Sequence, residues 1–242
     1  MAGILDRYGI KEVADVTFYK IDSNGNPGAP VLFLDTLKVS TIEQTAENVS
    51  ARGGKGNAEL IMWDYGKEIT LTLEDALFSA KSLAMMYGAD FEDGSDFKAV
   101  TKITKTVPVR DVTEDGKIKI NDKIFTPVTG TLKYYKADGS NGDTSTGVYA
   151  TADITVSGQQ ITISANDFPG NYYITGDTYA RNEVTGEDEF FQFIVPKAKM
   201  LSEVTLTMEA EGDPSTFNMN LKVLRPKDGV MMKLVQYTVP AQ

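Results

Sequence analysis

The sequence contains neither cysteine nor histidine among its 242 residues. Without cysteine the chain can form no disulfide, offers no thiol nucleophile, and supplies no thiolate ligand for a zinc finger or an iron–sulfur cluster. Without histidine it lacks the commonest general base and cannot build a Ser-His-Asp triad. Carboxylate-based chemistry remains open. The loss of both residue types nevertheless favours a protein that is not an enzyme and needs no cofactor or metal.

Long apolar runs are also missing. The longest, at residues 30–34, is far shorter than a membrane span requires. The first residues show no basic region followed by an apolar core, so we expect no signal peptide, no membrane partner and synthesis in a cytoplasm. A hydrophobic content of 41% with 24% charged residues is typical of a folded globular chain. The length allows one large domain or two smaller ones.

Positive charge is scarce relative to negative charge, and the formal net charge is -10. Tight binding to nucleic acid requires clustered lysine and arginine side chains that neutralise phosphates, so this charge disfavours it. The same charge favours solubility and is compatible with a surface past which nucleic acid slides without binding.

Alternation of apolar and polar residues predicts a chain made mostly of strands. Residues 13–21 and 31–42 flank a turn that contains Asn24-Gly25, which predicts a β-hairpin. One compact apolar helix is expected over residues 75–87, closed by Gly88. Further strands are expected at residues 69–74, 98–109, 172–181, 189–196, 201–210, 217–224 and 231–239. The predicted fold is therefore mostly β, an antiparallel β-sandwich or barrel with one flanking α-helix.

Short strands separated by turn residues every eight to twelve positions characterise residues 111–170. This spacing is typical of a small β-sandwich. We therefore expect a β-sandwich-like insert at 111–170 within a core formed by residues 1–110 and 171–242.

The glycine-rich segment 44–57 interrupts the strand pattern. A phosphate-binding loop is disfavoured because no Ser or Thr follows Lys55 and the next residues are strand-like rather than helical. A long loop on an antiparallel sheet and a loop that orders against a neighbouring subunit both remain open. The residues expected at such a subunit boundary are Glu47, Arg52, Gly53, Gly54, Lys55 and Gly56.

Three segments stand out in this pattern: residues 67–79 leading into the helix, the long loop before them, and residues 202–210 with the Asp213-Pro214 turn and the strand at 217–224. Together they resemble the corresponding segments of bacteriophage tail tube (major tail) proteins. The resemblance covers about half of the chain, within residues 13–110 and 170–240.

This resemblance implies a virion protein that assembles with itself into rings, expected to be hexamers, whose sheets join into an inner barrel. The rings stack into a tube through which viral DNA passes without specific binding, with tape-measure, sheath or baseplate proteins as further partners. The 111–170 insert would be Ig-like and project outward. Polar positions of the alternating strands are candidates for the lumen, although alternation alone fits an ordinary solvent face equally well. These are Thr70, Thr72, Glu74, Thr205, Thr207 and Glu209.

Other functions remain open from the residues alone. A baseplate, tail terminator or capsid decoration protein would share this composition. A carbohydrate-binding surface module would need exposed aromatic side chains, for which the candidates are Trp63, Tyr134, Tyr135, Tyr172 and Tyr173. A carboxylate hydrolase would use the acidic run Glu187-Asp188-Glu189, although such a run is more typical of a solvated hairpin tip. Asp138 to Asp143 lacks the spacing of a calcium loop and is expected to be a hydrated turn.

Overall fold

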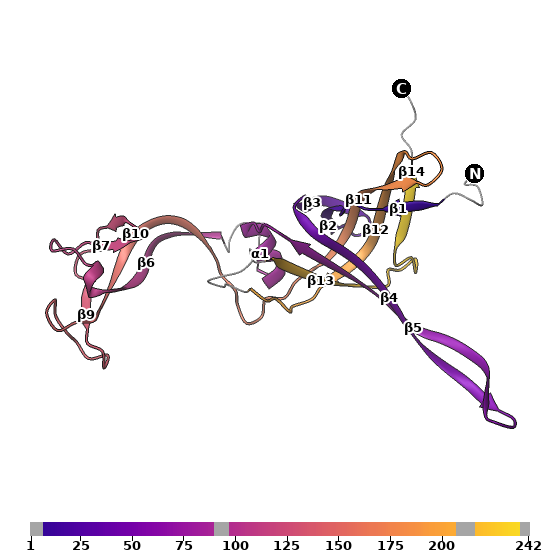
Figure 1. Ribbon diagram of the computed structural model, residues 1–242, viewed down its shortest axis with the longest axis horizontal. Coiled ribbons are helices and arrows are strands. Elements are labelled where there is room, and N and C mark those ends of the chain that lie inside the picture. Colours follow the sequence, from indigo (N-terminus) through magenta and orange to yellow (C-terminus); the bar gives the residue numbers. More distant parts are fainter. Residues whose placement is uncertain (1–6, 90–96, 207–215, 238–242) are drawn as a thin grey trace. The chain divides into compact units, whose positions relative to one another are not determined.

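The computed structural model describes residues 7–89, 97–206 and 216–237 (Figure 1). Within them the chain is mostly antiparallel strand with a single α-helix, which confirms the mostly β prediction. It divides into two compact units, the first of Met1–Phe91 with Ile163–Gln242 and the second of Glu92–Thr162.

The first unit is built on a nine-stranded sheet with one helix. Its central order is β3-β2-β11-β12-β13-β5-β4, while β1 adds to β11 and β14 adds to β12. The elements are β1 (Tyr8–Ile10), β2 (Asp15–Ile21), β3 (Pro27–Leu34), β4 (Leu37–Gly53), β5 (Ala58–Asp75), α1 (Ala80–Tyr87), β11 (Asn171–Asn182), β12 (Asp188–Met200), β13 (Phe217–Val223) and β14 (Lys233–Tyr237).

One hydrophobic core gathers the inward-facing residues of this sheet and the helix. Alternate residues of β5, such as Leu71 and Leu73, are buried, while Thr70 and Thr72 between them are half-buried. Phe18 of β2 and Ile174 of β11 are fully buried in the same core. The two-residue period of a strand thus separates one apolar face from one polar face.

The predicted N-terminal hairpin is confirmed as β2 paired with β3. In its turn, Asp22 Oδ1 accepts hydrogen bonds from the backbone N–H groups of Asn24 and Asn26, at 2.9 and 2.7 Å. The second predicted strand, at 31–42, was too long, because β3 ends at Leu34 and β4 begins at Leu37.

The helix begins later than predicted because β5 continues to Asp75. Asp75 is 1% exposed and its Oδ1 accepts hydrogen bonds from the Thr36 hydroxyl and the Leu77 N–H. Ser79 then caps the helix N-terminus. Gly88 ends the helix as predicted, with φ 77°, and a Cβ there would lie 2.3 Å from the backbone of Phe168. Only glycine fits this position.

The second unit has its own small core. β6 (Phe97–Pro108), β10 (Tyr149–Ile161) and β9 (Lys133–Tyr135) form one sheet, and β7 (Ile118–Ile120) pairs with β8 (Lys123–Phe125). A 3-10 turn at Val109–Asp111 follows β6. The unit boundaries differ from the expected insert limits of 111 and 170, because β6 pairs along its length with β10 rather than with the sheet of the first unit.

The predicted strand at 201–210 is wrong over its described part. Residues 201–206 form no strand, and 207–210 lie outside the described residues. Rather than closing a hairpin with this segment, β13 pairs with β5 and β12.

Candidate assembly interface

β4 and β5 continue together well past the rest of the sheet as a two-stranded arm, residues 46–67 (Figure 1). Thr45 and Glu68 are the last paired residues before it. The predicted loop at 44–57 is therefore wrong, because nearly all of that segment is strand paired with β5. Only residues 54–57 form a turn, in which the Asn57 N–H donates to the Gly54 carbonyl at 3.2 Å.

A bulge marks the base of the arm. Pairing shifts between Thr45 and Glu47, which leaves Gly66 and Lys67 of β5 opposite Ala46. Gly66 has φ 61°, a left-handed conformation that favours glycine. Bulges of this type bend a strand and increase its twist. The bulge therefore sets the direction in which the arm leaves the body.

The two faces of the arm differ in chemistry. Residues directly opposite each other share a face, and the cross-strand pairs are Val49 with Trp63, Ala51 with Ile61, and Glu47 with Tyr65. The opposite face, which we call the polar face of the arm, carries the pairs Ser50 with Met62 and Asn48 with Asp64. We call the set Val49, Ala51, Ile61, Trp63 and Tyr65 the apolar face of the arm.

This apolar face has no cover within the described chain. Val49, Trp63 and Tyr65 are each 53% exposed, and Ile61 is 54% exposed. At roughly 150–250 Å² per large side chain, half of it exposed, the face offers on the order of 400 Å² to solvent. A patch of this size is comparable to the largest apolar patch on a typical soluble monomer, and such patches are often functional.

The predicted boundary residues all belong to the arm. Glu47, Arg52 and Gly53 lie in β4, while Gly54, Lys55 and Gly56 lie in the turn. Arg52 approaches Glu59 at 3.8 Å, with both side chains exposed. The apolar face was missed, although the alternation of Ile61, Trp63 and Tyr65 with Met62 and Asp64 in the sequence would have indicated it.

Thr70, Thr72 and Glu74 share the polar face of β5, all half-buried. Opposite them on β13 are Lys222, Asn220 and Asn218. The Thr72 hydroxyl donates to Asn220 Oδ1 at 3.2 Å, and Lys222 Nζ lies 2.7 Å from Glu68 Oε1. Of the other lumen candidates, Thr205 is exposed outside any strand, and Thr207 and Glu209 lie outside the described residues.

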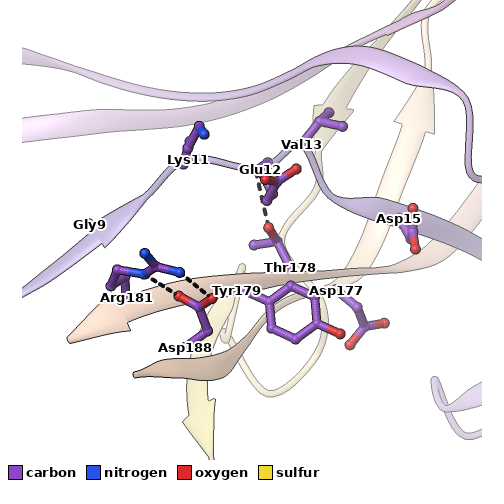
Figure 2. Close-up of a pocket in the computed structure, with 10 residues that line it drawn as sticks. All are labelled: Gly9, Lys11, Glu12, Val13, Asp15, Asp177, Thr178, Tyr179, Arg181 and Asp188. Atoms are coloured by element: carbon purple, nitrogen blue, oxygen red, sulfur yellow. Dashed lines mark hydrogen bonds and ion pairs between the residues drawn. The ribbon is translucent and has the colours of Figure 1, made fainter. Parts of the chain in front are cut away.

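A pocket of about 520 Å³ opens where the chain passes from β1 to β2 (Figure 2). Asp15 and Asp177 are direct cross-strand partners at its edge, an arrangement of like charges that is unfavourable unless a cation lies nearby. The Gln192 amide donates to Asp177 at 2.7 Å. Within residues 7–89, 97–206 and 216–237 neither carboxylate forms an ion pair.

Arg181 and Asp188 form a two-fold hydrogen-bonded ion pair on the other side of the pocket (Figure 2). Both N–O distances are 2.7 Å. The guanidinium hydrogen bonds lower the pKa of Asp188, and the carboxylate raises the pKa of Arg181. Because the Asp188 charge is neutralised in this way, Asp15, Asp177 and Glu12 are the pocket carboxylates that an external cation would meet.

Three aromatic side chains form a row between these two charged pairs. Tyr179 of β11 lies opposite Phe190 of β12, which lies opposite Tyr237 of β14. Ring centroids are 5.3 Å apart at both steps, and Phe190 stacks on Tyr237 at 15°. The three side chains are 49%, 37% and 39% exposed. We call Tyr179, Phe190 and Tyr237 the aromatic row.

The other sites considered from the sequence do not form a chemical centre. Asp188 is held by Arg181, and Glu189 instead accepts hydrogen bonds from Asn182 and Gln236. Asp138 and Asp143 accept hydrogen bonds from their own turns, as expected of hydrated turns. Among the residues that the structure describes, none group into a set of potential metal ligands, and no helix is long and apolar enough to span a membrane.

Comparison with known proteins identifies the relatives of this chain. The model of the YomU/Tube protein family matches residues 8–236. A tail tube protein of Bacillus phage SPR is 28% identical over 215 residues, covering 83% of this chain and 78% of that protein. The family model thus spans the arm, the sheet and the second unit.

Proposed function

The chain belongs to the YomU/Tube protein family and is a phage tail tube structural protein, and we propose that its copies assemble through the arm into stacked rings that form a hollow tube. The exposed apolar face of the arm is the observation that carries this proposal. The residues that the sequence predicts at a subunit boundary lie at the tip and base of this arm, which agrees with the proposal.

An arm of this kind is poorly stable on its own. A two-stranded ribbon has two open edges and is marginally stable in water. From Glu47 to Gly53 the arm extends about 20 Å at 3.3 Å per residue, and none of its residues belongs to the hydrophobic core. Docking against another copy would bury its apolar face and satisfy the free backbone groups along an edge. Self-association would therefore cover the exposed apolar face and pair an open strand edge in the same contact.

Rings follow from the edges of the sheet. β3 and β4 are the two end strands of its central order and carry unpaired backbone groups along their outer sides. Pairing of such edges between neighbours would extend the sheet around an axis, and closure at six copies gives the expected hexameric ring. The polar face with Thr70, Thr72 and Glu74 then lines the lumen. A net charge of -10 repels phosphate and lets DNA pass during ejection.

As a virion component the protein meets further tail proteins. A tape-measure protein inside the tube, a sheath around it and a baseplate at its end are the partners that this role implies, and synthesis takes place in the bacterial cytoplasm before assembly. The second unit is an Ig-like module projecting from the outside of the tube. Two observations support this role of the second unit. It has a hydrophobic core of its own, and the pairing of Phe97 with Ile161 brings its two ends together.

Removal of the arm tests the proposal. Because Thr45 and Glu68 face each other across the hairpin, an Asn-Gly turn can replace residues 46–67. We expect the purified natural sequence to form tubes in electron micrographs. The armless variant should form no tubes and should keep the far-UV circular dichroism profile of the body, since all core residues lie outside the arm. Tubes formed by a folded armless variant would contradict the proposal.

A further inference from the structure

The aromatic row is an exposed surface that no other part of the described chain covers. We propose that the aromatic row of one copy receives the apolar face of a neighbouring copy's arm. This inference rests on the proposed self-assembly and names the surface at which it occurs.

The two surfaces match in chemistry. The apolar face offers Trp63, Tyr65 and Ile61, and the row offers three aligned rings whose outer sides are open to solvent. Aromatic side chains supply large contact areas at a small cost in side-chain entropy, and they are enriched where proteins meet. The two tyrosine hydroxyls of the row can keep a water or backbone partner at the rim.

The charges beside the two surfaces are complementary. Lys55 lies in the turn at the tip of the arm and forms no ion pair within the described residues, whereas Arg52 lies beside Glu59. Asp177 lies two residues from Tyr179, about 7 Å along the strand, and faces Asp15 without an ion-pair partner in the described chain. When the apolar face covers the row, Lys55 at the tip of the arm can therefore approach the carboxylates of Asp15 and Asp177.

The symmetry of the proposed contact is compatible with assembly into a tube. The arm and the row are different surfaces, so their association is heterologous and repeats from copy to copy. A heterologous contact generates either a closed ring or a helical filament. Both outcomes are the geometry that a tube requires, whereas arms pairing with one another would give closed dimers.

Disulfide trapping tests the contact directly, because the natural chain has no cysteine. One protein carries Ile61→Cys on the apolar face, a second carries Tyr179→Cys on the row, and the two are mixed, assembled and oxidised. The matched control replaces Ile61→Cys by Asn48→Cys, which lies on the polar face of the same arm. Trapping requires Cα atoms within about 7 Å.

We expect a disulfide between the Ile61→Cys and Tyr179→Cys proteins, formed at least about tenfold faster than with the Asn48→Cys protein. Equal trapping of the control, or Ile61→Cys proteins linked only to each other, would overturn the inference. In a second measurement the double variant Tyr179→Ser/Tyr237→Ser should fold as a monomer and need at least about tenfold more protein to assemble.

Failure of this inference differs from failure of the proposed function. Tubes that form without the cross-link, and a row variant that assembles at the natural concentration, remove the row as the docking surface while leaving the arm's role intact. A natural chain that stays monomeric at high concentration without any cross-link overturns both.

Discussion

Trp63 is the one tryptophan of the chain and lies in the middle of the apolar face, 53% exposed. Its replacement by alanine is therefore a test of what the arm contributes to assembly. For a side chain of about 250 Å², burial of the exposed half removes about 130 Å² from water. At about 25 cal/mol per Å² this stabilises the contact by about 3 kcal/mol. Trp63→Ala should raise the critical concentration for assembly by about a hundredfold.

Light scattering across a concentration series measures that critical concentration. Met62→Ala is the matched control, because Met62 is 55% exposed on the opposite face of the same strand. We expect it to shift the critical concentration by no more than about twofold, since the polar face is not buried. Both variants should unfold in urea as the natural monomer does, because neither residue belongs to the core.

The fluorescence of Trp63 in the natural chain reports the same event. Its emission should shift to shorter wavelength and its quenching by acrylamide should fall when monomers assemble. The reasoning is refuted if Trp63→Ala and Met62→Ala change the critical concentration equally. An emission spectrum that is the same in monomer and tube would refute it as well.

Other predictions concern the body of the protein. Gly176→Ala should lower the free energy of unfolding in urea by about 2 kcal/mol, because a Cβ there would lie 2.1 Å from the buried ring of Phe193. Asp75→Ala should cost about 2 kcal/mol in the same assay, because it leaves the Thr36 hydroxyl and the Leu77 N–H without their acceptor. Acid should destabilise the second unit, because hydrogen bonds within it lower the pKa values of several carboxyl groups. When the pKa of a carboxyl group is lower in the folded than in the unfolded state, its stabilising contribution is present above about pH 4 and is lost as the pH falls. The groups are Asp115, Asp138, Asp143 and Asp153. Pepsin should therefore cleave the second unit faster as the pH is lowered from 4 to about 2, and equal cleavage at both values would contradict this.

Strands with one buried face were predictable from the sequence. In β5 the buried residues Ile69, Leu71 and Leu73 alternate with half-buried polar ones, and β2 follows the same pattern. The C-terminal end of the helix was predictable because a left-handed residue is needed there and Gly88 supplies it. The start of the helix was placed too early, because the buried Asp75 ends a strand rather than capping a helix.

The arm was missed for a physical reason. Within the described part of the chain none of residues 46–53 is buried in a core, so their sequence carries no core-facing period and resembles that of a polar loop. Apolar and polar residues do alternate in its partner strand, β5, but there the apolar residues face a surface that we propose is covered by another copy of the protein. The aromatic row could not be predicted from the sequence either, because Tyr179, Phe190 and Tyr237 come from three strands that only the sheet topology brings together.

Hydrogen exchange tests the docking of the arm on another copy most directly. In the monomer, the outward N–H groups of residues 47–53 and 58–65 lie on open edges and should exchange within the first time points. In assembled tubes the same amides should be protected at least about tenfold more strongly, while amides of the core change little. Arm amides that exchange equally fast in monomer and tube would contradict the account.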